Sequence, residues 1–162
     1  MSAQDTEVSA SDPHVLIEHV MCEKFVTVDI LAPLSDAVRL MRSENISCAI
    51  VTAEESPVGI ISEGDLARVL HEMLEGRHDG KKLASDVMTA PLITVQHSAT
   101  VHETLCSVEA NKIRRIAVLG SKGEIAGIIT QTELLHALTW DLELERAQQK
   151  IDLINLVQRS QI

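Results

Sequence analysis

Two short turns in this chain combine a glycine, a hydroxyl and a carboxylate at the same spacing. The first covers residues 59–65 and contains Gly59, Ser62 and Asp65, and the second covers 127–133 and ends with Thr130 and Glu133. In each turn two apolar residues end a predicted buried strand, and the hydroxyl begins a helix. Free backbone N–H groups and the helix dipole favour an anion such as phosphate at that point. The later carboxylate can accept hydrogen bonds from a diol such as ribose, so the turns predict nucleotide chemistry.

The same spacing has a purely structural interpretation. Ser62 with Asp65, and Thr130 with Glu133, also fit the capping box, in which the two side chains satisfy free donors at a helix start. Capping alone explains either turn taken singly. The presence of the whole pattern at corresponding places in two halves favours binding.

The two turns belong to a longer internal repeat. Val20-Met21 recurs as Val87-Met88, a shift of 67 residues (87 − 20), and the turns themselves are shifted by 68. This period exceeds the 20–50 residues typical of solenoid repeats. Two copies predict a pair of small units that bury their apolar faces against each other.

The elements that position the turns follow the same order in both halves. Short strands are predicted at 26–28 and 93–95, helices from about 33 to 45 and from about 101 to 111, and β-hairpins at 48–61 and 115–129. A second helix then begins at residue 63 or 131. Each unit is therefore β-α-β-β-α, an α+β fold with helices packed on a small sheet. The predicted divisions are a disordered tail (1–12), unit 1 (13–75), a linker (76–82), unit 2 (83–139) and a C-terminal helical extension (140–162).

The last helix continues past the end of the repeat. Its apolar residues alternate at spacings of three and four, as in a coiled-coil seam; they are Trp140, Leu144, Ala147, Ile151 and Ile154. Such a narrow stripe needs another helix to cover it. The helix either folds back onto its own chain or, as we favour, contacts a partner.

Composition excludes several classes of function. A net charge of −10 argues against nucleic-acid binding, which needs Lys and Arg to displace counterions. No apolar run reaches the roughly 20 residues that span a bilayer, and the acidic start differs from a signal peptide. The three cysteines suit reduced thiols, with Cys48 as a core residue and little support for a redox role. We expect a cytoplasmic protein without membrane contact.

Catalytic and metal-binding patterns are missing from the sequence. The seven histidines show no metal-ligand spacing, no nucleophile elbow or phosphate-binding lysine loop is present, and no nucleophile has an evident base. We therefore expect no enzyme, no metal site and no required cofactor.

The motifs together resemble a tandem pair of cystathionine-β-synthase (CBS) domains, also called a Bateman module. The resemblance rests on Val20-Met21, on 46–51 and 59–65, and on their counterparts 87–89, 113–118 and 127–133. It covers roughly residues 14–140. It implies two units packed through their sheets about a pseudo-twofold axis, with two clefts that often bind AMP, ADP or ATP, and in some members S-adenosylmethionine or NAD.

The resemblance also implies which residues line each cleft. In one cleft, Ser62 and Asp65 would hold phosphate and ribose, with Thr89, Leu92, Thr94 and Ile113 around the base. In the other, Thr130 and Glu133 would do so, with Cys22, Phe25, Thr27 and Ile46 around the base.

The chain departs from the family pattern at two places. Glu133 stands where aspartate is usual, and is one methylene longer. Arg114 and Arg115 stand where members direct a basic residue at phosphate, whereas the first copy has Ser47 and Cys48 there. Asp65 thus marks the better ribose site, while the arginines belong beside the other turn. A solvated pair or a surface salt bridge is the alternative role for these arginines.

The expected function is a regulatory module that senses an adenosyl ligand and relays its state to a partner or a fused effector through the last helix. A homodimer is the expected assembly. The alternative is a module with empty clefts that serves only dimerisation or docking.

Overall fold

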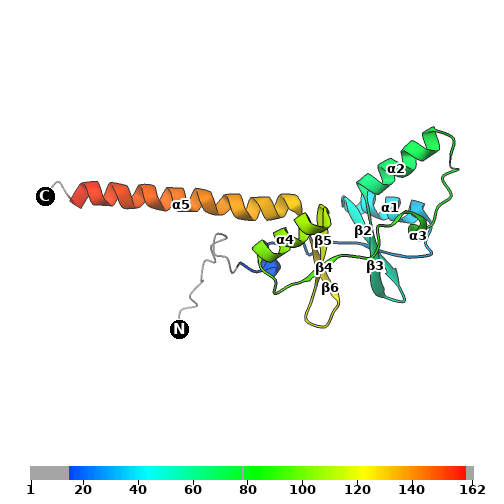
Figure 1. Cartoon of the computed structure of the whole chain (residues 1–162), viewed down its shortest axis with the longest axis horizontal. Helices are drawn as coiled ribbons and strands as arrows, with labels where there is room; N and C mark the ends of the chain where they lie inside the picture. The colour runs from blue at the N-terminus through cyan, green and yellow to red at the C-terminus, as the bar shows by residue number, and fades with distance from the viewer. Residues whose placement is uncertain (1–14, 78, 160–162) are drawn as a thin grey trace.

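The computed structural model describes residues 15–77 and 79–159, of which 140–145 and 152–159 are described by their backbone alone. Within these residues two three-stranded sheets stand side by side, each with its own helices (Figure 1). The α+β class and the duplicated arrangement predicted from the repeat are confirmed. The predicted tail at 1–12 lies outside the described residues.

The first unit contains β1 (Thr27–Asp29), α1 (Leu34–Glu44), β2 (Cys48–Ala53), β3 (Ser56–Ser62) and α2 (Glu63–Leu74). Strand β2 lies in the middle, parallel to β1 and antiparallel to β3. Helix α1 buries Leu34, Ala37 and Met41 at spacings of three and four, and ends at Asn45 in the left-handed conformation. These elements match the predicted ones to within two residues.

The second unit repeats this topology with β4 (Thr94–Gln96), α4 (Val101–Asn111), β5 (Arg115–Leu119), β6 (Ile125–Thr130) and α5 (Gln131–Arg159). Strand β5 is the central one, parallel to β4 and antiparallel to β6. Thr100 caps α4, where the Glu103 N–H donates to Thr100 Oγ1 over 3.2 Å. Backbone and side-chain hydrogen bonds from Thr100 lower the pKa of the Glu103 carboxyl.

The two sheets meet through a small apolar cluster. Cys48 and Ile50 of β2 pack with Ala117 of β5 and Ile128 of β6, and all four are buried. Phe25, Ile60, Leu92 and Ile125 close the edges of this cluster. The two units are therefore joined through their sheets, and the turns that follow β3 and β6 flank the junction.

The short segments before β1 and β4 are exchanged between the units. A 3-10 helix, η1 (Ile17–His19), precedes β1, yet Val15 and Ile17 belong to the core of the second unit. Figure 1 shows this segment beside α4, from which the chain crosses to β1. Conversely, α3 (Ala84–Val87) precedes β4 but packs into the core of the first unit.

Backbone hydrogen bonds hold both exchanged segments. Ile17 N–H donates to Ala99 O over 2.8 Å, and Ala84 N–H donates to Ala32 O over 2.8 Å. The packing thus crosses the predicted limits 13–75 and 83–139, because residues 15–21 complete the second core and 84–88 complete the first. Each exchanged segment ends at the next residue, where Cys22 pairs with Ile128 and Thr89 pairs with Ile60. Exchange explains why the two units cannot separate without each losing part of its core.

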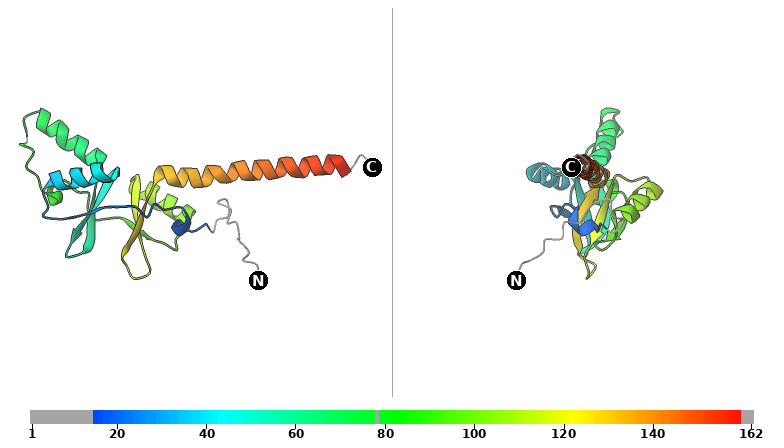
Figure 2. Two further views of the ribbon diagram at one scale, coloured as in Figure 1. Left: turned by 180° about the vertical axis from the view of Figure 1, so that it is seen from behind. Right: turned by 90° about the vertical axis from the view of Figure 1, so that its left-hand side faces the viewer.

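Helix α5 leaves the body of the protein as a long rod, and its end lies far from α1 and α2 (Figures 1 and 2). Leu134 and Ala137 anchor its first turns in the second core, whereas Ala147 and Ile151 are exposed. The other seam residues, Trp140, Leu144 and Ile154, have side chains outside the described set. None of the described helices is long and apolar enough to cross a membrane.

Candidate functional site

The first turn is closed by hydrogen bonds within the protein. Ser62 N–H and its Oγ hydroxyl donate to Asp65 Oδ2 over 2.9 and 2.7 Å. Asp65 Oδ1 accepts from Thr89 Oγ1 and from Arg68 Nη2, each over 3.4 Å. Both carboxylate oxygens therefore have protein donors, so a diol at Asp65 would have to displace some of them.

Gly59 is needed where the exchanged segment crosses β3. A Cβ atom there would lie 2.7 Å from Met88 Sδ and 3.0 Å from Thr89 O. Ile60 and Thr89 exchange backbone hydrogen bonds of 3.0 and 2.8 Å at this crossing. The turn thus gathers Gly59, Ser62, Asp65 and Thr89.

The residues predicted to surround the base in the first cleft make contacts in different parts of the structure. Leu92 N–H donates to Val58 O over 3.0 Å, and its side chain packs at the junction of the sheets. Thr94 lies in β4 opposite Ala117, and Ile113 packs against the second core. None of these residues, nor Ser62 or Asp65, lines either of the two hollows found at the second turn.

The second turn opens onto a cavity of about 240 Å³ between the units. Thr130 and Glu133 form a reciprocal cap, in which Thr130 N–H donates to Glu133 Oε2 over 2.6 Å and Glu133 N–H donates to Thr130 Oγ1 over 3.3 Å. Both residues also line the cavity, together with Cys22 and Ile46. Capping and an open site therefore coexist at this turn.

The remaining residues predicted for the second cleft lie elsewhere. Phe25 packs at the junction of the sheets, and Thr27 pairs with Ile50 in the first sheet. Neither is among the residues that line the cavity. The structure thus unites four of the six predicted residues in one hollow.

The two arginines lie on the side of the second turn. They line a hollow of about 320 Å³ with Ser47 and Thr130, at the start of α5. Arg115 Nε donates to Ser47 Oγ over 3.3 Å, and Arg114 O accepts from Gln131 N–H over 2.9 Å. This hollow shares Ser47 and Thr130 with the cavity of the second turn, so the two adjoin.

Five residues that line the cavity were not predicted as site residues from the sequence, and two of them, Cys48 and Ile128, belong to the buried cluster between the sheets. The other three are Lys24, Asn45 and Ser47, and Lys24 Nζ donates to Glu44 O over 2.7 Å. Lys24 was missed because the site residues were taken from positions shared by the two copies, and its counterpart at a shift of 67 is Pro91. The difference between the copies at this position was the signal available in the sequence.

The pKa of the Cys48 thiol reflects the charged groups around the cavity. Burial raises the pKa of its thiol, and the Arg115 guanidinium opposes that effect. The pKa is also raised by the neighbouring Glu133, Glu63 and Cys22. Charges of both signs therefore converge on this end of the junction.

Glu18, His97 and Ser121 form a hydrogen-bonded line on the second unit. His97 Nδ1 lies 2.7 Å from Glu18 Oε2, and its Nε2 lies 2.9 Å from Ser121 Oγ. The order resembles a hydrolytic triad, which needs donors where an oxyanion develops. Glu23 and Glu124 line the same hollow and would repel such an anion. We assign the line to holding η1 against the β5–β6 hairpin.

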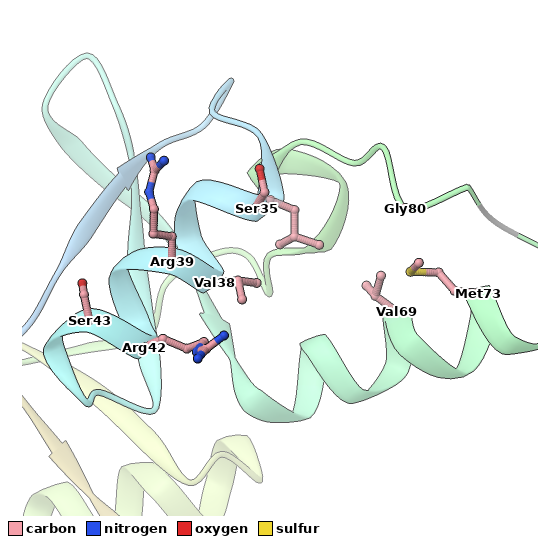
Figure 3. Close-up of a pocket in the computed structure, with 9 residues that line it drawn as sticks. Ser35, Val38, Arg39, Arg42, Ser43, Val69, Met73 and Gly80 are labelled. Atoms are coloured by element: carbon pink, nitrogen blue, oxygen red, sulfur yellow. The ribbon is translucent and has the colours of Figure 1, made fainter.

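A separate apolar groove lies between α1 and α2, at the far end of the first unit (Figure 3). Its volume is about 570 Å³, and Val38, Val69 and Met73 face into it while Arg42 lies on its wall. The neighbouring Leu70 and Leu74 of α2 are 56% and 78% exposed. This surface is distinct from the junction between the sheets.

Within the described part of the chain, no group of three or more His, Cys, Asp or Glu residues could hold a metal ion.

Comparisons with known proteins agree with the geometry. The model of the CBS domain matches residues 17–72 and again 84–139. An uncharacterized protein of Methanopyrus kandleri is 30% identical over 129 residues, which cover 74% of this chain and 65% of that protein. The chain spans less of two Methanocaldococcus jannaschii relatives, 42% and 46% of their lengths.

Solved structures of two proteins share the fold. The CBS domain pair of protein MJ0100, solved twice with 5′-methylthioadenosine and S-adenosyl-L-methionine, has a TM-score of 0.66 and 19–20% identity, covering 76–78% of this chain and 98–99% of that one. CBSX2 in complex with AMP has a TM-score of 0.63 and 21% identity, covering 78% and 97%. At these identities the likeness establishes the fold.

Proposed function

Because the chain belongs to the CBS domain family and carries the domain twice, we propose that it is a regulatory module whose second cleft binds an adenosyl ligand. AMP, ADP or ATP is the preferred ligand, ahead of S-adenosylmethionine or NAD. Binding regulates a partner or a fused effector, and the chain itself catalyses no reaction.

One observation carries this proposal: two adjoining hollows meet at Thr130. One is lined by Glu133, Cys22 and Ile46, and the other by Arg114 and Arg115. A nucleotide needs a half-apolar space for the base, an acceptor for the ribose and cations for the phosphate. The first hollow supplies the space for the base and the acceptor for the ribose, and the second supplies the cations for the phosphate.

Each side chain has a distinct role in this assignment. Ile46 and Cys22 contact the base, and the Glu133 carboxylate accepts hydrogen bonds from the ribose hydroxyls. Arg115 and the Thr130 hydroxyl bind phosphate, with help from the N-terminal N–H groups of α5. A bidentate arginine contact to phosphate is among the stronger hydrogen-bonded pairs in proteins.

Similar proteins support an adenosyl ligand in particular. CBSX2 was solved with AMP, and the MJ0100 pair with two adenosyl compounds. These ligands are properties of those proteins. They support the choice of adenine compounds as the first class to test on this chain.

The first turn has a different assignment. Asp65 already accepts from Ser62, Thr89 and Arg68, so its main role is to cap α2 and to hold the exchanged segment at Thr89. Ligand binding at this turn is a second event that requires Arg68 to withdraw. We therefore rank the cleft at Glu133 ahead of the cleft at Asp65.

Relay to a partner is assigned to α5, because this helix starts at the ligand turn and runs to Arg159. A ligand that favours one arrangement of the two units shifts the position of that start. The exposed Ala147 and Ile151 then offer apolar contacts to a partner far from the cleft.

Self-association is assigned to the groove between α1 and α2, with a second copy of this chain as occupant. Met73 lines the groove, and the exposed Leu70 and Leu74 of the same helix add to its apolar surface. Arg42 on the groove wall makes no ion pair within the described residues, and a second copy of net charge −10 offers it acidic groups.

Isothermal titration calorimetry tests the proposal, with AMP, ADP, ATP, S-adenosylmethionine and NAD each titrated into the full chain. At least one adenine compound should bind. Arg115→Ala should weaken a phosphate-bearing ligand by roughly tenfold to a hundredfold, the value of a charged hydrogen bond. Lys122→Ala, which removes a cation from the β5–β6 hairpin, is the matched control and should bind as the native chain does.

The alternative, a docking module with empty clefts, gives a different result. None of the five compounds would then release heat or raise the melting temperature. A ligand present at 100 times its Kd should otherwise stabilise the chain by about 2.7 kcal/mol. If none of the five compounds binds, the alternative takes the place of the ligand proposal.

A further inference from the structure

Two of the three cysteines lie in the wall of one cavity. Cys22 and Cys48 both line the hollow at the second turn, although 26 residues separate them in the chain (48 − 22). Cys22 belongs to the exchanged N-terminal segment and is exposed, whereas Cys48 opens β2 and is 3% exposed. The fold therefore places one accessible and one buried thiol on a shared surface.

Ile128 of β6 connects the two cysteines. Cys22 and Ile128 exchange two backbone hydrogen bonds, each of 2.9 Å. Cys48 packs with Ile128 in the buried cluster at the junction of the sheets. The electrostatic influence of Cys22 on Cys48 agrees with this proximity.

The two thiols differ in reactivity. Cys22 is accessible, and its Sγ donates to Lys24 O over 3.6 Å. Accessible thiols are the ones that oxidants reach first. Burial raises the pKa of Cys48, so this thiol stays protonated and reacts second.

We propose that Cys22 and Cys48 are a redox modification site, at which a hydroperoxide forms a disulfide across the adenosyl cavity and excludes the ligand. This inference rests on the proposed function for its effect on ligand binding, but not for the bond itself. The disulfide would tie β2 to the exchanged segment and fill the end of the cavity assigned to the base.

The chemistry proceeds in two balanced steps. The Cys22 thiolate attacks one oxygen of hydrogen peroxide, the O–O bond breaks, and the products are a sulfenic acid and water once protons are counted. The Cys48 sulfur then attacks the Cys22 sulfur, and the sulfenic hydroxyl leaves as a second water with the Cys48 proton. Two thiols are oxidised and one peroxide is reduced.

Cys106 provides a control within the same chain. It is an exposed thiol on α4 that lies 3.9 Å from His102 Nε2 and outside the cavity. An oxidant that reacts with thiols on accessibility alone would modify Cys106 as readily as Cys22. Formation of a specific bond therefore depends on the partner thiol Cys48.

The experiment treats the reduced full chain with stoichiometric hydrogen peroxide, blocks free thiols and maps tryptic peptides without reductant. Cleavage after Lys24, Arg42 and Arg68 places Cys22 in peptide 1–24, Cys48 in 43–68 and Cys106 in 83–112. We expect the first two peptides to be linked. Cys106→Ser should leave that link unchanged, and Cys48→Ala should replace it with oxidised Cys22 alone.

A linked peptide that contains Cys106, or Cys22 oxidised to sulfinic acid with Cys48 intact, would overturn the inference. Titration with AMP then tests the consequence: the oxidised chain should bind at least tenfold more weakly than the reduced one, and dithiothreitol should restore binding. If the bond forms but neither state binds AMP or another adenine compound, the proposed function fails while the disulfide stands. If AMP binds equally to both states, exclusion by the disulfide is wrong.

Discussion

Gly127→Ala tests the exchange of segments between the two units. A Cβ atom at Gly127 would lie 2.7 Å from Cys22 O and 3.0 Å from Met21 Sδ. The closer atom belongs to the backbone of the exchanged segment, so the contact cannot be relieved by rotating a side chain. We expect the segment to move away and its two hydrogen bonds with Ile128 to break.

The size of the effect follows from these contacts. Forcing a methyl group into a packed site costs about 1–3 kcal/mol, and each lost hydrogen bond costs about 1 kcal/mol. The smaller conformational entropy of alanine in the unfolded chain returns roughly 0.5 kcal/mol. The free energy of unfolding should therefore fall by about 3 kcal/mol, and the melting temperature by roughly 6–12 °C.

Gly59→Ala is the matched variant in the first unit. Its Cβ would lie 2.7 Å from Met88 Sδ, which is near the end of a flexible side chain, while the nearest backbone atom is Thr89 O at 3.0 Å. We expect a smaller loss, about 1 kcal/mol. Urea unfolding of both variants measures the difference. A harmless Gly127→Ala would refute the exchanged packing. A Gly59→Ala that costs as much or more would contradict the smaller loss expected where the closest atom belongs to a side chain.

Three further predictions concern the core, a helix cap and the groove. Ile129→Ala, at a fully buried position of β6, should lower the free energy of unfolding by about 2–5 kcal/mol in urea titrations. Glu103→Gln should lower the melting temperature at neutral pH only. Hydrogen bonds from Thr100 lower the pKa of the Glu103 carboxyl. The carboxylate therefore stabilises the folded chain above its unfolded pKa, and this stabilisation is lost as the pH falls through the folded pKa. A constant difference down to strongly acidic pH would contradict that cause. Met73→Glu places a charge in the groove between α1 and α2, and light scattering should show weaker self-association; an unchanged mass would remove the groove from the interface.

Local patterns predicted most of the elements. The apolar spacing and Asn45 gave the end of α1, and Ser62 and Thr130 marked the starts of α2 and α5. The exchange at 15–21 and 84–88 could not be predicted in this way. Val20-Met21 and Val87-Met88 are the same dipeptide, so either copy suits either core, and only the packing of the whole chain selects between them.

The two turns of the site could be predicted from the sequence, but not which of them is the better ligand site. From the residues alone Asp65 is the better ribose ligand than Glu133. The structure shows Asp65 engaged by Arg68, an interaction across one helical turn whose competition with a ligand cannot be judged from spacing. Lys24 and Ser47 reach the second cleft from the first unit, and contacts between units leave no periodic signal in a sequence.

Calorimetric titration of AMP into the native chain, Glu133→Ala and Asp65→Ala tests the assignment of the cleft most directly. The native chain and Asp65→Ala should bind with similar Kd values, because the carboxylate of Asp65 is occupied by protein donors. Glu133→Ala should bind at least tenfold more weakly, as expected for the loss of hydrogen bonds to a charged acceptor. Retained binding in Glu133→Ala together with lost binding in Asp65→Ala would contradict the assignment and place the ligand at the first turn.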